Sequence, residues 1–355
     1  MDRLKLFKDL TEVPGVPGYE TEVREAIRRY TPPGVKVVED RLGSIILEKT
    51  GTSSSPRIML PAHMDEIGFM VRTIDKDGFI RFLPLGGWWD QVMISQRVVI
   101  HTKKEPLLGV VGSKPPHLMP VDERDKMVKK KDMYIDIGAT SKEDAIEMGV
   151  SVGDAITPYS PFTTFNKDTL FLGKAWDDRI GCCLFLELLH DLQGVEHPNT
   201  IYGAGTVQEE VGLRGAYTSV RVVNPDVAII LEVAIAGDTP GIKEEECQVK
   251  MGKGPALLVY DARMIPNLKL RNLAIETAAQ KEIPLQLDAM DAGATDGGII
   301  HLHEKGVPTI VLGVPTRYIH GHQGFFNISD YENTLKLLKA LVMKLDQETV
   351  ESLTR

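Results

Sequence analysis

The hydrophobic and polar positions divide the chain into two regions of alternating helices and strands with a strand-rich region between them. Before residue 69, helical spacing of apolar residues over Leu4–Leu10 and Glu20–Tyr30 precedes the short apolar runs KVVED, SIILEK and RIMLPAH, which predict strands. After Asn166, RIGCCLFLELLHDL predicts an apolar helix, and TIYGAGTV, VAIILEVA, LQLDAM and TIVLGV predict strands. Two further helices are predicted, at Leu268–Lys281 and Ser329–Leu345.

The middle region has a different pattern of apolar and polar residues. FMVRTIDKDGFIRFLPLGG, with a DG turn between alternating runs, is followed by RVVIHT, LLGVVGS, MYIDIG and DAITPYS, with one helical segment at Ser141–Met148. Short strands separated by turns are typical of a small β-barrel or sandwich. Outside this region, alternating strands and helices predict a mostly parallel sheet covered on both faces. The sequence therefore predicts an α/β domain, residues 1–68 and 165–355, interrupted by an all-β insertion, residues 69–164.

Composition and charge exclude several classes of protein. With 43% hydrophobic and 26% charged residues, the chain resembles an ordinary globular protein. No apolar run approaches the roughly 20 residues that span a bilayer, and MDRLKLFKDL lacks a signal-peptide core, so we expect a cytoplasmic protein without a membrane partner. A net charge of −9 disfavours nucleic-acid binding. Cys182, Cys183 and Cys247 form no CxxC pair and are expected to be free thiols.

Candidate catalytic and metal-binding residues follow the predicted strands, at the end of the sheet where open α/β proteins bind ligands. His63 and Asp65 follow one strand, and Glu209 and Glu210 follow another. The remaining candidates are Glu232 and Asp238 in VAIILEVAIAGD, His320 and His322 in PTRYIHGH, and Asp177 and Asp178 at the start of the apolar helix.

Each of these residues has an ordinary structural interpretation when taken alone. A carboxylate at a helix N-terminus is usually a cap, and adjacent glutamates are usually solvated surface. Together at one sheet edge, however, they would repel each other unless a cation were present. Two histidines with three carboxylates suit two borderline metal ions that share a bridging carboxylate and leave a position for water, which points to metal-assisted hydrolysis. The pair His301 and His303 has no third local donor and is not predicted to bind metal.

Six segments of the sequence, in order, resemble the M42 metallo-aminopeptidases, also called tetrahedral or TET aminopeptidases and sometimes labelled endoglucanases. These segments are AHMDEIGFM, AWDDRIG, TVQEEVGLRGA, AGDTPG, GATDGGIIHL and PTRYIHGH. The resemblance spans nearly the whole chain and includes the β insertion with its KPPH stretch. It implies an α/β metallopeptidase domain with an inserted barrel-like or PDZ-like dimerisation domain.

The resemblance also implies a role for each matching residue. His63 and Glu232 would bind one metal ion, Glu210 and His320 would bind the second, and Asp177 would bridge the two. Glu209 would be the general base that acts on a metal-bridging water. Asp65 would orient His63, as carboxylates commonly do for ligating imidazoles. Because successive strand residues point to opposite sides, Glu209 and Glu210 would diverge into these two roles.

The implied enzyme is activated by two Zn²⁺ or Co²⁺ ions and removes N-terminal residues from short peptides. Relatives assemble as dimers through the β insertion and then as a hollow tetrahedral dodecamer, which admits unfolded or pre-cut peptides. This chain departs from many relatives in having Glu232 where they have Asp, Trp176 before the bridging aspartate, and GATD near Asp296, so the preferred metal stays open. Met264 and Ile265 suggest a pocket for neutral side chains, although both residues are equally plausible in the core.

Two other functions stay open from the sequence. A glycosidase would need two carboxylates and no metal, which leaves the two histidine sites without a purpose. A non-catalytic, metal-binding assembly scaffold would keep the same residues without turnover.

Overall fold

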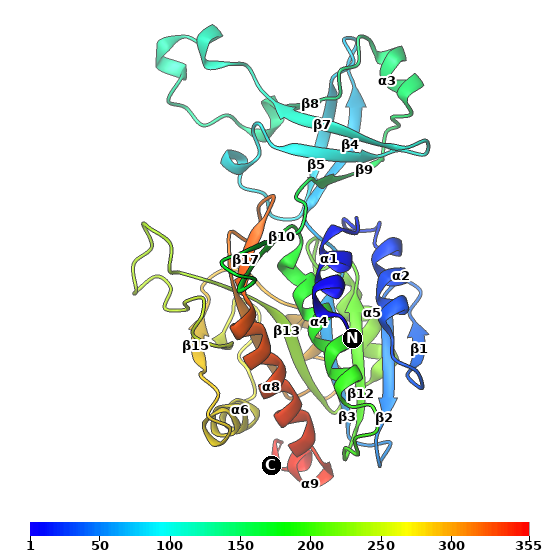
Figure 1. Cartoon of the computed structure of the whole chain (residues 1–355), viewed down its shortest axis with the longest axis vertical. Coiled ribbons are helices and arrows are strands. Elements are labelled where there is room, and N and C mark those ends of the chain that lie inside the picture. The colour runs from blue at the N-terminus through cyan, green and yellow to red at the C-terminus, as the bar shows by residue number, and fades with distance from the viewer. Residues whose placement is uncertain (355) are drawn as a thin grey trace.

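The computed structural model describes residues 1–354 and has two parts that are stacked along its long axis. Figure 1 shows an α/β body that contains both ends of the chain and a barrel that projects from it. The predicted α/β class with an inserted β-barrel is confirmed.

A mixed sheet forms the centre of the α/β body. Its four central strands are parallel, and antiparallel strands flank them on both sides. In spatial order the strands are β1 (Lys36–Glu39), β2 (Ile45–Thr50), β12 (Thr200–Thr206), β3 (Arg57–His63), β13 (Val227–Ile235), β16 (Thr309–Arg317), β17 (Gly324–Asn327), β11 (Leu170–Gly173) and β10 (Thr163–Phe165), with β14 (Ala256–Tyr260) and β15 (Gln286–Ala289) branching from β16. The parallel part is thus narrower than the sequence pattern predicts.

Helices cover both faces of this sheet. One face packs against α1 (Arg3–Glu12), α2 (Thr21–Tyr30), α4 (Trp176–Asp191), α6 (Leu268–Gln280) and α8 (Ile328–Lys344). The other face packs against α5 (Arg214–Val223) and α7 (Gly297–Ile300), and α9 (Gln347–Ser352) follows α8. Neighbouring residues of β3 separate accordingly: Ile58 and Leu60 join the first core, and Met59 joins the second. This alternation is the reason why the central strands are apolar throughout.

The barrel is closed and antiparallel, with the strand order β4-β5-β8-β7-β6-β9. Phe69, Val98 and Ile135 belong to its separate apolar core. Its elements are β4 (Gly68–Ile74), β5 (Ile80–Leu85), η1 (Asp90–Val92), β6 (Arg97–His101), β7 (Pro106–Gly112), η2 (Pro116–Leu118), η3 (Val121–Glu123), η4 (Lys130–Asp132), β8 (Tyr134–Asp136), α3 (Lys142–Met148) and β9 (Ala155–Pro158).

Cys182 and Cys183 are buried in α4, and all three cysteines are free thiols, as the sequence predicts. Among the described residues, no helix is both long enough and apolar enough to cross a membrane.

Candidate metal centre

Most of the polar residues that the sequence singled out meet at the carboxyl edge of the parallel strands, whereas Asp238 forms an ion pair with Arg317 and the His322 ring packs against Trp88. His63 is the last residue of β3 and pairs in register with Thr206, the last residue of β12, so Glu209 and Glu210 follow close by. Glu232 lies within β13. His320 follows β16, and Asp177 lies at the start of α4. Parallel strands carry their carboxyl ends to one edge, which explains why distant segments converge.

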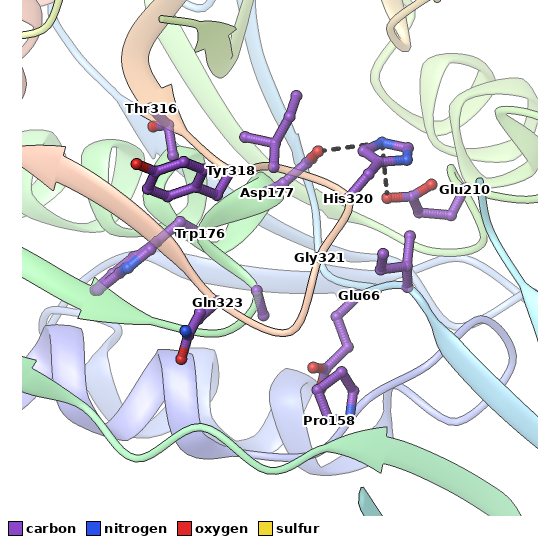
Figure 2. Close-up of a pocket in the computed structure, with 14 residues that line it drawn as sticks. Glu66, Pro158, Trp176, Asp177, Glu210, Thr316, Tyr318, His320, Gly321 and Gln323 are labelled. Carbon is purple, nitrogen blue, oxygen red and sulfur yellow. Dashed lines mark ion pairs between the residues drawn. The ribbon is translucent and has the colours of Figure 1, made fainter. Parts of the chain in front are cut away.

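The Asp177 carboxylate lies between two imidazoles. Its Oδ1 is 2.9 Å from His63 Nε2, and its Oδ2 is 3.4 Å from His320 Nε2. His320 Nε2 is also 3.7 Å from Glu210 Oε1, and Figure 2 shows these two contacts of His320. One group of donor atoms close enough to share an ion consists of His63, Asp177 and Glu210.

A second such group contains His63, Asp178 and Glu232, so Asp178 joins the centre although the sequence assigned it no role there. Its Oδ2 accepts the main-chain N–H of His63, and its Oδ1 accepts that of Gly181, each at 3.1 Å. These hydrogen bonds engage both oxygens and tie the start of α4 to the end of β3. The WDD motif was visible in the sequence, but only the folded chain shows which aspartate faces which partner.

His63 is oriented by a carbonyl rather than by a carboxylate. Its Nδ1–H donates to the main-chain oxygen of Asp65 at 2.8 Å, whereas the nearer Asp65 carboxylate oxygen is 3.7 Å away. The carboxylate instead accepts the main-chain N–H groups of Glu209 and Glu210, one on each oxygen, both at 3.0 Å. The expected hydrogen bond from His63 is therefore made to the main-chain oxygen of Asp65, while the Asp65 carboxylate stays within ion-pair distance of His63 and accepts the two N–H groups.

The two hydrogen bonds that the Asp65 carboxylate accepts, called the Asp65 clamp below, also change the explanation for the directions of Glu209 and Glu210. Glu209 and Glu210 lie beyond the end of β12, so strand alternation does not set their directions. The Asp65 carboxylate fixes the main chain of both residues.

The segment of the barrel between β5 and η1 contacts two of the candidate ligands. His320 Nδ1–H donates to the main-chain oxygen of Gly87 at 2.8 Å, which leaves Nε2 directed towards Asp177. Gly86, at φ +86°, packs so closely that an added Cβ would lie 3.0 Å from Glu210 Oε2 and 2.4 Å from Ile67 Cγ2. The inserted domain thus helps to position the candidate ligands.

Burial and crowding shift the protonation of the carboxylates. Burial raises the pKa of Glu209 and Glu232 well above the usual range, and neighbouring carboxylates raise it further. Burial and the charge of Asp177 raise the pKa of Glu210 to about 7. Such a site favours a divalent cation, because its charge would stabilise the ionised carboxylates.

The pKa values of Asp177 and His320, whose side chains are in direct contact, shift in the directions that favour an ion pair. Burial opposes charge on both, but hydrogen bonds with His320 and His63 hold the pKa of Asp177 well below its usual range. The same contact raises the pKa of His320 to about 10. Two imidazoles with several carboxylates are a donor set that fits borderline metal ions such as Zn²⁺.

Asp296, in GATD, is a buried acid close to Glu209. Its Oδ2 accepts the Thr206 hydroxyl at 2.6 Å, and its Oδ1 has no hydrogen-bond partner among residues 1–354. Burial raises the pKa of Asp296 to about 6, and its charge contributes to the raised pKa of Glu209. The sequence identified this motif only as part of a resemblance, since nothing in its spacing predicts proximity to Glu209.

A cavity of about 540 Å³ opens beside the centre. His63, Asp177, Glu209, Glu210, Glu232 and His320 line one side of it. Residues 292–295 also line it, whereas Met264 and Ile265, which the sequence left open between a pocket and the core, do not. Met264 is buried in the apolar cluster under α5, and Ile265 is 68% exposed elsewhere. The cavity has the size of a small-molecule or peptide-residue site.

The histidine pair set aside from the sequence lies outside both donor groups. His301 Nδ1 contacts the main-chain oxygen of Gly297, and His303 Nε2 contacts Asn224 Oδ1.

An α/β sheet with clustered imidazoles and carboxylates at its carboxyl edge is the arrangement of a metal-dependent hydrolase. Residues 43–337 match the family described as M42 glutamyl aminopeptidase, and residues 2–25 match a short family described as AMPT. The chain belongs to the M42 family and is an aminopeptidase. Members of this family are metalloenzymes, in agreement with the donor groups around His63.

Named relatives cover almost the whole chain. A glutamyl aminopeptidase of Lactococcus lactis is 36% identical, with 99% of this chain and 98% of the relative covered. A lysyl aminopeptidase of Pyrococcus furiosus is 37% identical, with 96% and 97% covered.

Solved structures agree with this assignment. A TET aminopeptidase from a marine-sediment Thaumarchaeota archaeon is 49% identical, with a TM-score of 0.97 over 99% of both chains. The TET1 peptidase of Pyrococcus horikoshii, which can assemble into a tetrahedron or a large octahedral shell, is 31% identical, with a TM-score of 0.86 over 97% of this chain and 100% of that one.

Proposed function

We propose that this chain is a dinuclear-metal aminopeptidase that hydrolyses N-terminal residues from short peptides. His63, Glu232 and Asp177 would hold one divalent ion, Zn²⁺ or Co²⁺, and Glu210, His320 and Asp177 would hold the other. The observation that carries this proposal is the Asp177 carboxylate between two imidazoles, 2.9 Å from His63 Nε2 and 3.4 Å from His320 Nε2.

When bound, the ions supply water of lowered pKa and polarise the scissile carbonyl. Glu209 is the general base: its carboxylate takes the proton of the attacking water and then delivers it to the leaving amine. The buried surroundings that raise the pKa of Glu209 favour holding that proton between the two transfers. Asp65 supports this role by fixing the main chain of Glu209 through a 3.0 Å hydrogen bond.

The proposal extends to the assembly. We infer homodimers joined through the barrel, which combine into a hollow tetrahedral dodecamer, as the resemblance implies and as the tetrahedral assembly of the Pyrococcus horikoshii relative supports. Short or unfolded peptides are then the substrates, because folded proteins would not enter the shell. A cytoplasmic location stays a prediction from the sequence.

The first test measures hydrolysis of an aminoacyl-p-nitroanilide panel before chelation, after chelation, and after Co²⁺ or Zn²⁺ is added back. We expect activity to disappear with the metal and to return with it. Activity that survives complete metal removal would contradict the proposal.

A second test separates the two neighbouring glutamates. Glu209→Gln should retain bound metal and lose about 100-fold or more in kcat, as general-base removal commonly does. Glu210→Gln should lose metal, because a charged donor oxygen becomes an amide. Metal content by elemental analysis and kcat by the same assay check both variants. Equal metal content and equal residual rates would contradict the assignment.

The other two functions have weaker support. A glycosidase does not need imidazoles around one carboxylate, and cleavage of carboxymethylcellulose would revive that possibility. A non-catalytic scaffold would bind metal without hydrolysing any member of the panel.

A further inference from the structure

An acidic side chain that the metal centre does not use lies in the wall of the 540 Å³ cavity. Asp288 is on β15, directly opposite Leu258 of the parallel strand β14, and both residues line the cavity. Asp288 is half-buried, and burial raises the pKa of its carboxyl. The residue therefore presents a partly desolvated carboxylate to whatever occupies the cavity.

Among the described residues, no cation accompanies Asp288. It forms no ion pair, and the main-chain N–H of Ala289 is the group that favours its charged form. The wall around it is apolar, with Leu258, Met290 and Ile242, and the described lining contains no lysine or arginine. An ionised group in such a place is stabilised by a cation that arrives with the ligand.

The metal centre and Asp288 line the same cavity, and residues 233–236, at the end of β13 and just after it, also contribute to its wall. A peptide with its first carbonyl at the centre would extend its first side chain along this wall. Apolar residues would pack against the methylene groups of a long side chain, and the carboxylate would meet its tip.

We propose that Asp288 selects substrates whose N-terminal residue carries a cationic side chain, lysine or arginine. This inference rests on the proposed aminopeptidase function and names its substrate class. An acidic side chain would meet a like charge and no compensating cation, so glutamyl and aspartyl peptides are the poorest substrates. The expectation of a pocket for neutral residues is replaced, because its basis, Met264 and Ile265, lies outside the cavity.

The test compares lysyl-, arginyl-, norleucyl- and glutamyl-p-nitroanilide with the metal-loaded enzyme. Norleucine matches the lysine chain without its ammonium group, so the ratio of the two kcat/KM values isolates the charge. In the unmodified enzyme we expect lysine and arginine to exceed norleucine by about 10-fold or more, and glutamate to be slowest.

Asp288→Asn should lower kcat/KM for lysine and arginine roughly 10- to 100-fold and change norleucine by less than about threefold. The matched control is Asp291→Asn, an exposed aspartate three positions further along that does not line the cavity, and it should leave every ratio unchanged. Metal content and norleucine turnover show whether the variant remains folded.

The possible failures can be distinguished. If Asp288→Asn lowers all four substrates equally, the residue holds the α-amine or the fold, and the selectivity proposal is overturned. A preference of the unmodified enzyme for norleucine or glutamate overturns it as well. If none of the four substrates is hydrolysed by metal-loaded enzyme, the proposed function itself fails, and this inference fails with it.

Discussion

Asp65 acts on the centre through three oxygens. Its carbonyl orients His63, and its carboxylate holds the main chain of Glu209 and Glu210. In Asp65→Asn, one carboxylate oxygen becomes an N–H donor that faces another donor, so the glutamate segment should shift while His63 keeps its partner. We expect kcat to fall about 10- to 100-fold, with a smaller loss of bound metal. Steady-state kinetics and elemental analysis test this, and a complete loss of metal at unchanged kcat per bound ion would refute it.

Glu20 gives a pH dependence of stability that does not involve the proposed ligands. Its Oε1 accepts the main-chain N–H groups of Gly18 and Gln208, and burial together with the Asp65 charge raises its pKa to about 7. Because the folded-state pKa lies above the ordinary value of 4.5, its contribution to stability is full below pH 4.5 and is lost as the pH rises through about 7.

Glu20→Gln stays neutral and can accept the same hydrogen bonds. Relative to this variant, the unmodified metal-free protein should lose on the order of 2 kcal/mol of unfolding free energy between pH 5 and pH 8. Denaturant titrations of both proteins at the two pH values measure the difference. Parallel pH profiles would show that Glu20 ionises normally in the fold.

At the residue scale, the sequence placed His63, Asp177, Glu210 and His320 near a strand end or a helix start. It placed Glu232 within an apolar strand, and the family resemblance gave all five their roles as proposed ligands. The sequence could not predict what joins them. The Asp65 clamp and the hydrogen bond from His320 to Gly87 depend on main-chain groups, which every residue carries and no motif distinguishes. Asp288 was missed because a single aspartate in a short strand is ordinary until the cavity beside it is known.

The contact between α4 and β3 depends on one glycine. At Gly181, an added Cβ would lie 2.6 Å from Asp178 Oδ2 and 2.8 Å from Ala62 Cβ. Gly181→Ala should push the start of α4 away from β3, with a net cost of about 1–3 kcal/mol and weaker metal binding. The thermal midpoint and the metal content report on both effects. A variant with unchanged metal affinity would mean that the Asp178 contact does not position the centre.

Long apolar elements were predicted, and several short ones were not. The apolar segment of α4 and the run of α8 match the predicted helices closely. By contrast, α5 was missed because LRGAYTSVRVV is short and contains a glycine and several β-branched residues, which lower helix propensity. Strands β10, β11 and β17 have three or four residues and form through pairing with each other and with β16, which local sequence does not encode.

On the scale of the molecule, the connection between β7 and β8 exposes apolar side chains. Val121 is 76% exposed and Leu118 is 70% exposed, and Figure 1 shows this segment extending beyond the barrel strands. Exposed apolar residues of this kind favour burial against another subunit. Val121→Asp should therefore yield a smaller species by light scattering, whereas Val121→Thr, similar in shape and uncharged, should keep the native assembly. An unchanged mass for Val121→Asp would place the contact elsewhere.

The hydrogen bond from His320 to the Gly87 carbonyl limits how this enzyme can be shortened. A truncated peptidase made by joining Ile67 to Ser160 would keep the whole parallel sheet but would lack the acceptor that orients one imidazole. Such a protein could fold and still bind its ions poorly. The barrel is therefore not a removable module, and a lineage or a designer that discards it must supply a new acceptor at the same place.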